Sequence, residues 1–253
     1  MNQSPGTNAH AVVDVLNDAG PAGIVLVCEH ASCSIPDDLD NLGLDGPALT
    51  SHAACDIGAF GVAKTISAQL DAPLVFSKIS RLVYDCNRPP EAPDAMPERS
   101  EAFDIPGNRH LTEHQKAGRI SRYYRPFERQ LEQTLADKPD PVLVTIHSFT
   151  PVYHGVRRDT EIGILHDDDR RLADAMLRCA GNHCDLETRR NEPYGPKDGV
   201  THTLRRHALA QGRLNVMLEI RNDLIADRDG QTDLAAMMSG WITDALTRVE
   251  HAA

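Results

Sequence analysis

Short apolar runs recur along the chain and predict buried β-strands. They are Ile24 to Cys28, Pro73 to Phe76, Val142 to Ile146, Ile162 to Leu165 and Asn215 to Ile220. Their length and their content of Val, Ile and Leu are typical of strands that are buried on both faces. The pattern therefore predicts a set of core strands spread over most of the sequence.

Segments with a helical period lie between these runs. From Pro47 to Leu70 apolar residues recur at spacings of three and four, and Asp45 and Pro47 are signals for the start of a helix. Further helices are predicted over 112–135, where "TEHQ" is a capping pattern, and over 168–179 and 232–249. Strands that alternate with helices predict a single α/β domain with a mostly parallel central sheet and helices on both faces.

Two stretches depart from this alternation. Residues 1–20 have neither a basic segment nor an apolar one of signal-peptide type, so we expect a flexible leader, followed by one catalytic domain over residues 21–253. Residues 81–109 hold five prolines and no clear period. Because compact domains rarely keep so long a loop without a use, we expect a functional flap or rim there.

The charge and the cysteines limit the class of protein. A formal net charge of -11 disfavours nucleic acid or an anionic membrane as a partner, which leaves a small molecule. The six cysteines form no zinc-binding C-x-x-C pair, and we expect them to be reduced thiols of a soluble cytoplasmic protein. We expect a monomer or a small homo-oligomer.

Polar residues with metal-binding or catalytic side chains come at the ends of three of the apolar runs. Glu29 and His30 follow the first run, His147 follows "VLVTI", and Glu219 lies near the end of the last run. Ligands bind beyond the carboxyl ends of parallel strands, so these groups are expected to converge although they are far apart in sequence. Their convergence indicates a metal site.

Zinc fits this set best, because a catalytic zinc ion takes three protein ligands from His and carboxylate and keeps one position open. In "SHAACDIGAF", His52 and Asp56 are four residues apart and share a face of the predicted helix. We predict the ligands His30, Asp56 and His147. His52 is an alternative to Asp56, and Glu29 is either a ligand or a carboxylate that orients a ligand imidazole.

Arginines cluster next to these positions although the protein is acidic. Arg81 and Arg88 lie in "SRLVYDCNRP", and Arg221 lies two residues after Glu219. Because guanidinium groups bind carboxylates in a bidentate way, they indicate a small anionic substrate. Ordinary ion pairs with Asp85 and Asp223 are the alternative.

Seven segments together resemble the N-formylglutamate amidohydrolase family. They are "CEHAS", "SHAACDIGAFGVAK", "SRLVYDCNRP", "IPGNR", "TIHSFTPVYHGVRR", "NEPY" and "LEIRNDL". They come in the order of the family, and the resemblance covers about residues 22–228. The resemblance implies an α/β domain similar in plan to the phosphorylase/hydrolase-like domain of zinc carboxypeptidases and of the aspartoacylase group. It also implies hydrolysis of an N-acyl amino acid at one bound zinc ion per chain. None of the seven segments contains the compact His-x-x-Glu pair of that wider group, so the identity of the carboxylate ligand stays open.

The resemblance also implies roles for individual residues. Glu219 would be the general base, and Asn87 with Arg88 would bind a substrate carboxylate. With N-formyl-L-glutamate as substrate, we expect Arg81 to stabilise the oxyanion and formate and L-glutamate to be released. Further substrate contacts are expected from Arg221 or Arg157, for a second carboxylate, and from Asn191 and Tyr194. The name of the family suggests a place in histidine catabolism.

Other functions remain open at this point. The chain could hydrolyse a different N-acyl amino acid, or it could be a non-catalytic sensor of acidic metabolites. A serine hydrolase is disfavoured, because neither Ser32 nor Ser148 lies in the G-x-S-x-G pattern of a nucleophile elbow.

Overall fold

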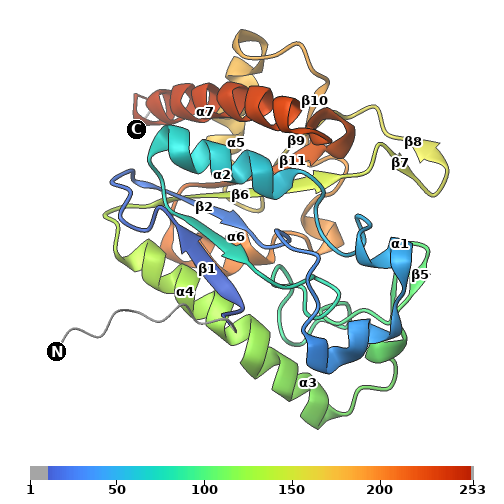
Figure 1. Cartoon of the computed structure of the whole chain (residues 1–253). Coiled ribbons are helices and arrows are strands. Elements are labelled where there is room, and N and C mark those ends of the chain that lie inside the picture. Colours follow the sequence, from blue (N-terminus) through green and yellow to red (C-terminus); the bar gives the residue numbers. More distant parts are fainter. Residues whose placement is uncertain (1–10, 252–253) are drawn as a thin grey trace.

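The protein is built around one twisted sheet of seven strands, as shown by a computed structural model that describes residues 11–251 (Figure 1). The strands are β1 (Val13–Leu16), β2 (Ile24–Cys28), β3 (Leu74–Ser77), β6 (Val142–Phe149), β9 (Ile162–Leu165), β10 (Thr188–Arg190) and β11 (Asn215–Arg221). Their order in the sheet is β1-β3-β2-β6-β11-β9-β10. The pairs β3–β2, β2–β6, β6–β11 and β9–β10 are parallel, whereas β1–β3 and β11–β9 are antiparallel. The prediction of a mostly parallel sheet is confirmed.

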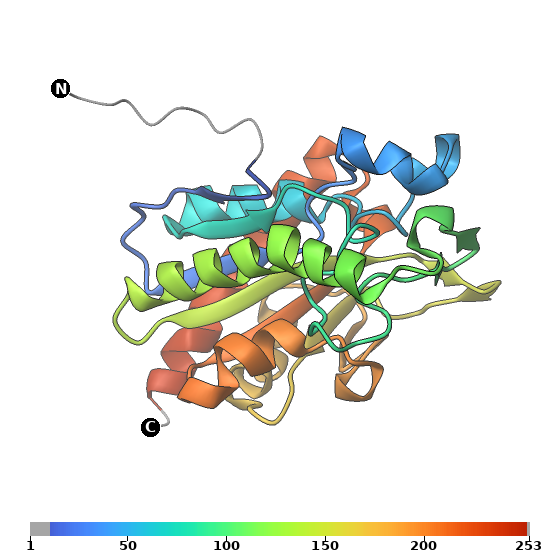
Figure 2. The ribbon, with the colours of Figure 1, turned by 90° about the horizontal axis from the view of Figure 1, so that it is seen from below.

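Helices cover both faces of the sheet, and the described chain forms a single α/β domain, as predicted. On one face lie α2 (Ala59–Leu70), α5 (Arg171–Cys179) and α7 (Arg228–Glu250). The other face packs against α4 (Arg125–Ala136) and α6 (His202–His207), both of which lie in front of the sheet in Figure 2. The short helices α1 (Gly46–Leu49) and α3 (Glu113–Arg119) lie at the periphery (Figure 1). Within the described residues, no helix combines the length and the apolar character that a membrane crossing requires.

The continuous apolar runs follow from this layering. Alternate residues of each central strand point to opposite faces, so that Leu218 packs towards α2, α5 and α7 while Met217 packs towards α4 and α6. Both faces exclude water, so neither face of these strands needs polar residues. The polar residues near the carboxyl ends of the strands, such as His147 in β6 and Glu219 in β11, therefore need a separate explanation.

Each predicted strand is present, with changed bounds. β6 continues to Phe149, so His147 lies inside this strand rather than after it, and β11 ends at Arg221, one residue later than the predicted run that contains Glu219. The sequence patterns did not predict β1, β10 or two hairpins. These hairpins are β4 (Arg99–Ser100) with β5 (Phe103–Asp104), and β7 (Val152–Tyr153) with β8 (Val156–Arg157).

The predicted helix over 47–70 is wrong in its first half. α1 ends at Leu49 and α2 begins at Ala59, and residues 50–58 between them form turns. Gly58 has a left-handed φ of 79°, and a Cβ atom there would lie 2.3 Å from the carbonyl oxygen of Ile225. His52 and Asp56 therefore do not share a helix face, and tertiary contacts place them instead.

The other helices agree with the predictions apart from their ends. The helical stretch over 113–136 begins with a capping box of Thr112 and Gln115 and contains one π-helical turn. α5 starts at Arg171 rather than at 168. α7 starts earlier than predicted, at Arg228, because the Asp227 side chain accepts a hydrogen bond from the Gly230 backbone N–H.

Two expectations about the first part of the chain need correction. Residues 1–10 of the predicted leader lie outside the described residues, but residues 13–16 form the ordered edge strand β1, which pairs with β3. Cys33 and Cys55 form a disulfide, contrary to the expectation that all cysteines are reduced thiols. The fold brings their Cα atoms to 5.0 Å, and the spacing of the cysteines in sequence did not indicate this pair.

Candidate active site

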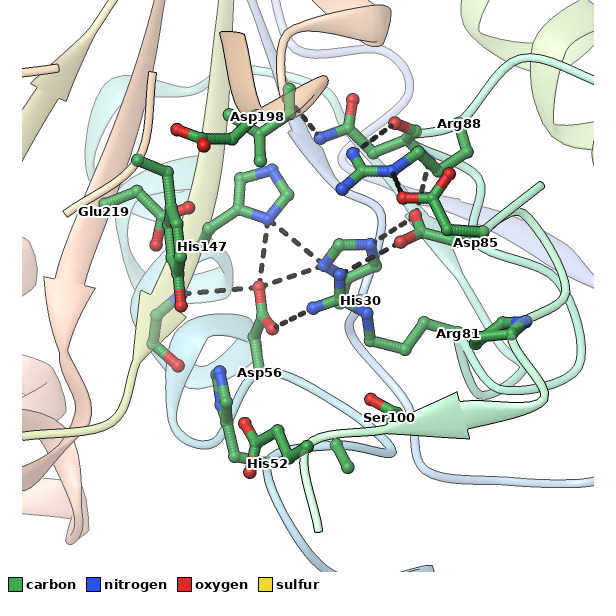
Figure 3. A pocket seen from close by; sticks show the side chains of 18 of the residues that line it. His30, His52, Asp56, Arg81, Asp85, Arg88, Ser100, His147, Asp198 and Glu219 are labelled. Atoms are coloured by element: carbon green, nitrogen blue, oxygen red, sulfur yellow. Dashed lines mark hydrogen bonds and ion pairs between the residues drawn. The ribbon is translucent and has the colours of Figure 1, made fainter. Parts of the chain in front are cut away.

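A polar cavity of about 580 Å³ lies beyond the carboxyl ends of β2, β6 and β11 (Figure 3). These three strands run parallel, so their ends meet at one edge of the sheet, as the sequence predicted. Residues between Arg81 and Glu101 supply much of the lining. The proline-rich segment over 81–109 therefore forms one wall of the cavity.

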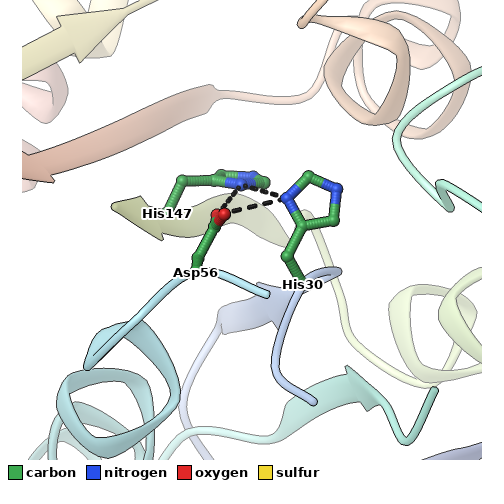
Figure 4. A group of neighbouring side chains, drawn as sticks. All are labelled: His30, Asp56 and His147. Atoms are coloured by element: carbon green, nitrogen blue, oxygen red, sulfur yellow. Dashed lines mark hydrogen bonds and ion pairs between the residues drawn. The ribbon is translucent and has the colours of Figure 1, made fainter. Parts of the chain in front are cut away.

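Three donor atoms from separate parts of the chain meet at the base of the cavity (Figure 4). Asp56 Oδ2 lies 3.1 Å from His30 Nδ1 and 2.9 Å from His147 Nδ1, and the two Nδ1 atoms are 3.3 Å apart. All three side chains are buried. Adjacent ligands of a tetrahedral zinc ion with bonds of 2.0–2.1 Å are about 3.3 Å apart, so the donor spacing fits such an ion closely.

The other nitrogen of each imidazole faces a carboxylate. His30 Nε2 lies 2.7 Å from Asp85 Oδ1, and His147 Nε2 lies 3.1 Å from Glu29 Oε2. The His30 contact is a hydrogen bond, whereas the His147 contact is within ion-pair distance but lacks hydrogen-bond geometry. With Nε2 protonated on the side of these acids, each Nδ1 presents its lone pair to the shared centre. Carboxylates commonly orient metal-binding histidines in this way.

Strand register explains why Glu219 belongs to the same cluster. Glu219 of β11 pairs with His147 of β6, and neighbouring residues in register point to the same side of a sheet. Glu219 lines the cavity, and its Oε2 atom is buried without a hydrogen-bond partner among the described residues. Burial raises the pKa of Glu219 to about 7 and outweighs the opposing effect of His147. Near neutral pH, Glu219 can therefore exchange a proton.

Negative charge dominates the cluster. Burial would raise the pKa of Asp56, but His30, His147 and Arg81 hold it well below its usual range. The pKa of Asp85 is likewise lowered, because His30 and Arg81 outweigh its burial. Arg81 donates to Asp56 Oδ1 at 3.2 Å and to Asp85 Oδ2 at 2.9 Å. Glu29, Asp56, Asp85 and Glu219 bring four buried carboxyl groups to the cluster, and Arg81 is the guanidinium that is hydrogen-bonded to two of them. This excess of buried carboxyl groups makes the site suited to a cation.

The comparisons with known proteins agree with this geometry. A family model described as N-formylglutamate amidohydrolase matches residues 22–226. The chain belongs to the N-formylglutamate amidohydrolase family. The protein is therefore a hydrolase that acts on an amide bond.

Two solved structures are similar to this member of the family. A gene product of Agrobacterium tumefaciens is 53% identical, with a TM-score of 0.92 over 94% of this chain and 96% of its own. An N-formylglutamate amidohydrolase from Ralstonia eutropha is 16% identical, with a TM-score of 0.72 over 96% of this chain and 100% of its own, and shows the same fold. A comparison with curated proteins finds no match.

The structure separates the alternatives for the third donor of the cluster. Asp56 lies with His30 and His147, whereas Glu29 lies behind His147 on the far side of its ring. His52 lines the cavity but lies apart from this network (Figure 3). Burial lowers the pKa of His52 to about 4, so its imidazole is neutral at pH 7.

Three of the predicted substrate contacts line the cavity, namely Asn87, Arg88 and Tyr194. The Asn87 amide is also part of the scaffold, because its Nδ2 donates to the Val200 carbonyl at 2.5 Å and its Oδ1 accepts from the Thr203 backbone N–H at 3.0 Å. Arg88 donates to Asp94 and to the Gly199 carbonyl. These bonds fix both side chains in place at the wall of the cavity.

Three other predicted contacts do not line the cavity. Arg221 pairs with Glu161 and Asp223, so the alternative of ordinary ion pairs holds for it. Arg157 is exposed on the β7–β8 hairpin. Asn191 adopts a left-handed φ of 48°, and its Oδ1 accepts a hydrogen bond from the His166 backbone N–H. Arg221 and Asn191 therefore make contacts within the fold, and Arg157 is exposed to solvent.

Sequence reasoning missed two residues of the site. Arg158, not Arg157, lines the cavity, and it donates to Tyr194 Oη at 2.8 Å while its guanidinium lies 4.5 Å from the centre of the Tyr153 ring. Asp85 was considered only as a partner of an arginine, although it also binds His30. The doublet of Arg157 and Arg158 was visible in the sequence, but not which side chain faces inward.

Proposed function

We propose that this hydrolase cleaves N-formyl-L-glutamate to formate and L-glutamate, with one zinc ion held by His30, Asp56 and His147. The observation that carries the proposal is the convergence of these three donors, with the second nitrogen of each imidazole turned towards a carboxylate. Family membership supports the reaction class, and the excess of buried carboxyl groups supports a cation.

The bound zinc ion would supply Lewis acidity, which lowers the pKa of a water molecule and polarises the scissile carbonyl group. Glu219 is positioned to accept a proton at its unpaired Oε2 and to return it to the departing amine. Arg81 is held by Asp56 and Asp85 at the cavity wall, where its positive charge stabilises the oxyanion of the transition state.

The two carboxylates of the substrate need two cationic subsites. Arg88 and Arg158 both line the cavity, and each is fixed by hydrogen bonds to its own surroundings. We assign one carboxylate to Arg88 and the side-chain carboxylate to Arg158, which replaces Arg157 and Arg221 in this role. Tyr194 holds the Arg158 guanidinium beside the cavity.

A substrate panel tests the proposed reaction. Formate or acetate release is measured for N-formyl-L-glutamate, N-formyl-L-glutamine and N-acetyl-L-glutamate, each with zinc-loaded and with chelated protein. We expect the highest kcat/KM for N-formyl-L-glutamate and loss of activity on chelation. A preference for another acyl amino acid would contradict the substrate assignment, and binding without turnover of any compound would favour a sensor.

Replacing Arg158 by methionine is expected to raise KM for N-formyl-L-glutamate about 10- to 100-fold, with a smaller change in kcat. The variant removes the charge that we assign to the side-chain carboxylate, so KM for N-formyl-L-glutamine should change less. Arg157→Met is the matched control, because that side chain is exposed on the adjacent hairpin position. Equal effects of the two substitutions would contradict the assignment.

Replacing Asp85 by asparagine is expected to weaken zinc binding about tenfold, because the His30 ring loses its charged partner at Nε2. Zinc affinity is measured by competition with a chromogenic chelator. Asp94→Asn is the control, since Asp94 pairs with Arg88 at the rim. An unchanged affinity in Asp85→Asn would show that this carboxylate does not support the metal site.

A further inference from the structure

The Cys33–Cys55 disulfide joins the two loops that carry His30 and Asp56. Cys33 comes three residues after His30, and Cys55 comes directly before Asp56. The bond connects positions 22 residues apart in sequence. It therefore crosslinks two donor-bearing segments within a few residues of the donors themselves.

The segment that carries Asp56 has few regular contacts of its own. Residues 50–58 form turns rather than a helix, so no ladder of helical hydrogen bonds fixes the Asp56 backbone. Beyond the disulfide and the hydrogen bonds of the Asp56 side chain, three hydrogen bonds tie the backbone of the segment to distant parts of the described chain. Asp56 N–H donates to the His30 carbonyl at 3.0 Å, Ser80 Oγ donates to the Ala54 carbonyl at 2.7 Å, and Ser148 Oγ donates to the Ile57 carbonyl at 2.8 Å.

We propose that the Cys33–Cys55 disulfide is a redox-sensitive positioning bond that raises the affinity of the His30, Asp56 and His147 site for zinc. This inference rests on the proposed function, because it presumes that the three donors bind a metal ion. The crosslink restricts the two loops before the ion binds, so less conformational freedom is lost on binding. Reduction returns that freedom to the loops and lowers the affinity.

The redox step is an ordinary thiol–disulfide exchange with a dithiol reductant. One thiolate of the reductant attacks a sulfur of the disulfide, with Cys33 the more exposed of the two residues, and the Cys33–Cys55 bond breaks. The second thiol of the reductant then displaces this cysteine from the mixed disulfide. In total, the protein gains two electrons and two protons and holds two thiols, and the dithiol leaves as a disulfide.

Zinc affinity, measured on the full chain in both redox states, tests the inference. Metal-free protein is divided into an oxidised sample and a sample reduced anaerobically with a dithiol that is then removed. Zinc is titrated into each against a chromogenic chelator. We expect reduction to weaken binding roughly tenfold to a hundredfold, the range for loss of a group that orients metal ligands.

Two variants separate positioning from general stability. Cys33→Ser should bind zinc as weakly as the reduced protein and should not respond to further reduction. Cys184→Ser removes a free, partly buried thiol and should behave as the unmodified protein in both states. Saturating zinc should restore kcat to reduced protein and to Cys33→Ser, because their fold and catalytic groups are intact.

Three results would contradict the proposed role of the Cys33–Cys55 disulfide. Equal zinc affinity of the oxidised and reduced protein would refute the positioning role and leave the proposed metal site standing. Alkylation of both Cys33 and Cys55 in unreduced protein would show that the bond is absent. Failure of the oxidised protein to bind zinc at all would refute the metal site together with this inference.

Discussion

Glu219→Gln is expected to lower kcat by about 10²- to 10⁴-fold while zinc remains bound at one equivalent. Glutamine preserves the shape of the side chain but cannot accept a proton, and the proposed mechanism uses Glu219 for each proton transfer. The two measurements are kcat for formate release and the zinc content of the same preparation. Glu161→Gln is the control, because Glu161 pairs with Arg221 outside the cavity.

The pH profile gives a second test of this assignment. Burial raises the pKa of Glu219 to about 7, and the base form is lost as the pH falls through that value. A bound cation stabilises the Glu219 carboxylate and lowers its pKa, so the activity of the zinc-loaded protein should be lost as the pH falls through a value at or below about 7.

For the substitution itself, a kcat of Glu219→Gln within tenfold of the unmodified protein would rule out Glu219 as the base.

Replacing His30 or His147 by alanine is expected to weaken zinc binding by more than about a hundredfold. Each change deletes a donor atom of the proposed site. The loss of zinc affinity should therefore exceed the roughly tenfold to hundredfold loss that follows removal of a group that only orients a ligand. Zinc retained after dialysis against a mild chelator is the measurement, and circular dichroism establishes that each variant is folded.

His52→Ala is the matched control for these variants, since His52 lines the same cavity but lies outside the donor cluster. It should retain one equivalent of zinc. Stoichiometric zinc in both His30→Ala and His147→Ala would refute the ligand set, and loss of zinc in His52→Ala would favour His52 as a ligand.

The sequence predicted the sheet well because its central strands are buried on both faces. Runs such as Ile24 to Cys28 are apolar throughout, so a polar residue at their ends is conspicuous. Parallel strands bring their carboxyl ends to one edge, and this general rule was enough to predict that His30, His147 and Glu219 would meet. Hydrophobic pattern and topology sufficed for this part of the site.

Features fixed by tertiary contacts were not predictable in the same way. The helical period over 47–70 continues through residues 50–58, yet this segment is held by the Cys33–Cys55 bond and by the hydrogen bond of Asp56 N–H to His30. These partners lie at least 22 residues away in sequence, where local periodicity gives no information. Asp56 was therefore predicted as a donor for a geometric reason that the structure does not bear out.

The arginines illustrate the same limit. Arg157 and Arg158 are adjacent and chemically identical, and only the path of the β7–β8 hairpin decides that Arg158 faces the cavity. Arg221 was predicted as a substrate contact because it lies close to Glu219 in sequence, but its position at the end of β11 brings it to Glu161. Proximity in sequence indicated the region of the site but not the orientation of each side chain.

The central claim is that catalysis depends on one zinc ion held by His30, Asp56 and His147. The most direct measurement titrates zinc into metal-free protein and follows formate release from N-formyl-L-glutamate at each addition. We expect no formate release without metal, a linear rise of the rate with added zinc, and a plateau at one zinc ion per chain. Full activity of the metal-free protein, or a rise that is unrelated to zinc occupancy, would contradict it.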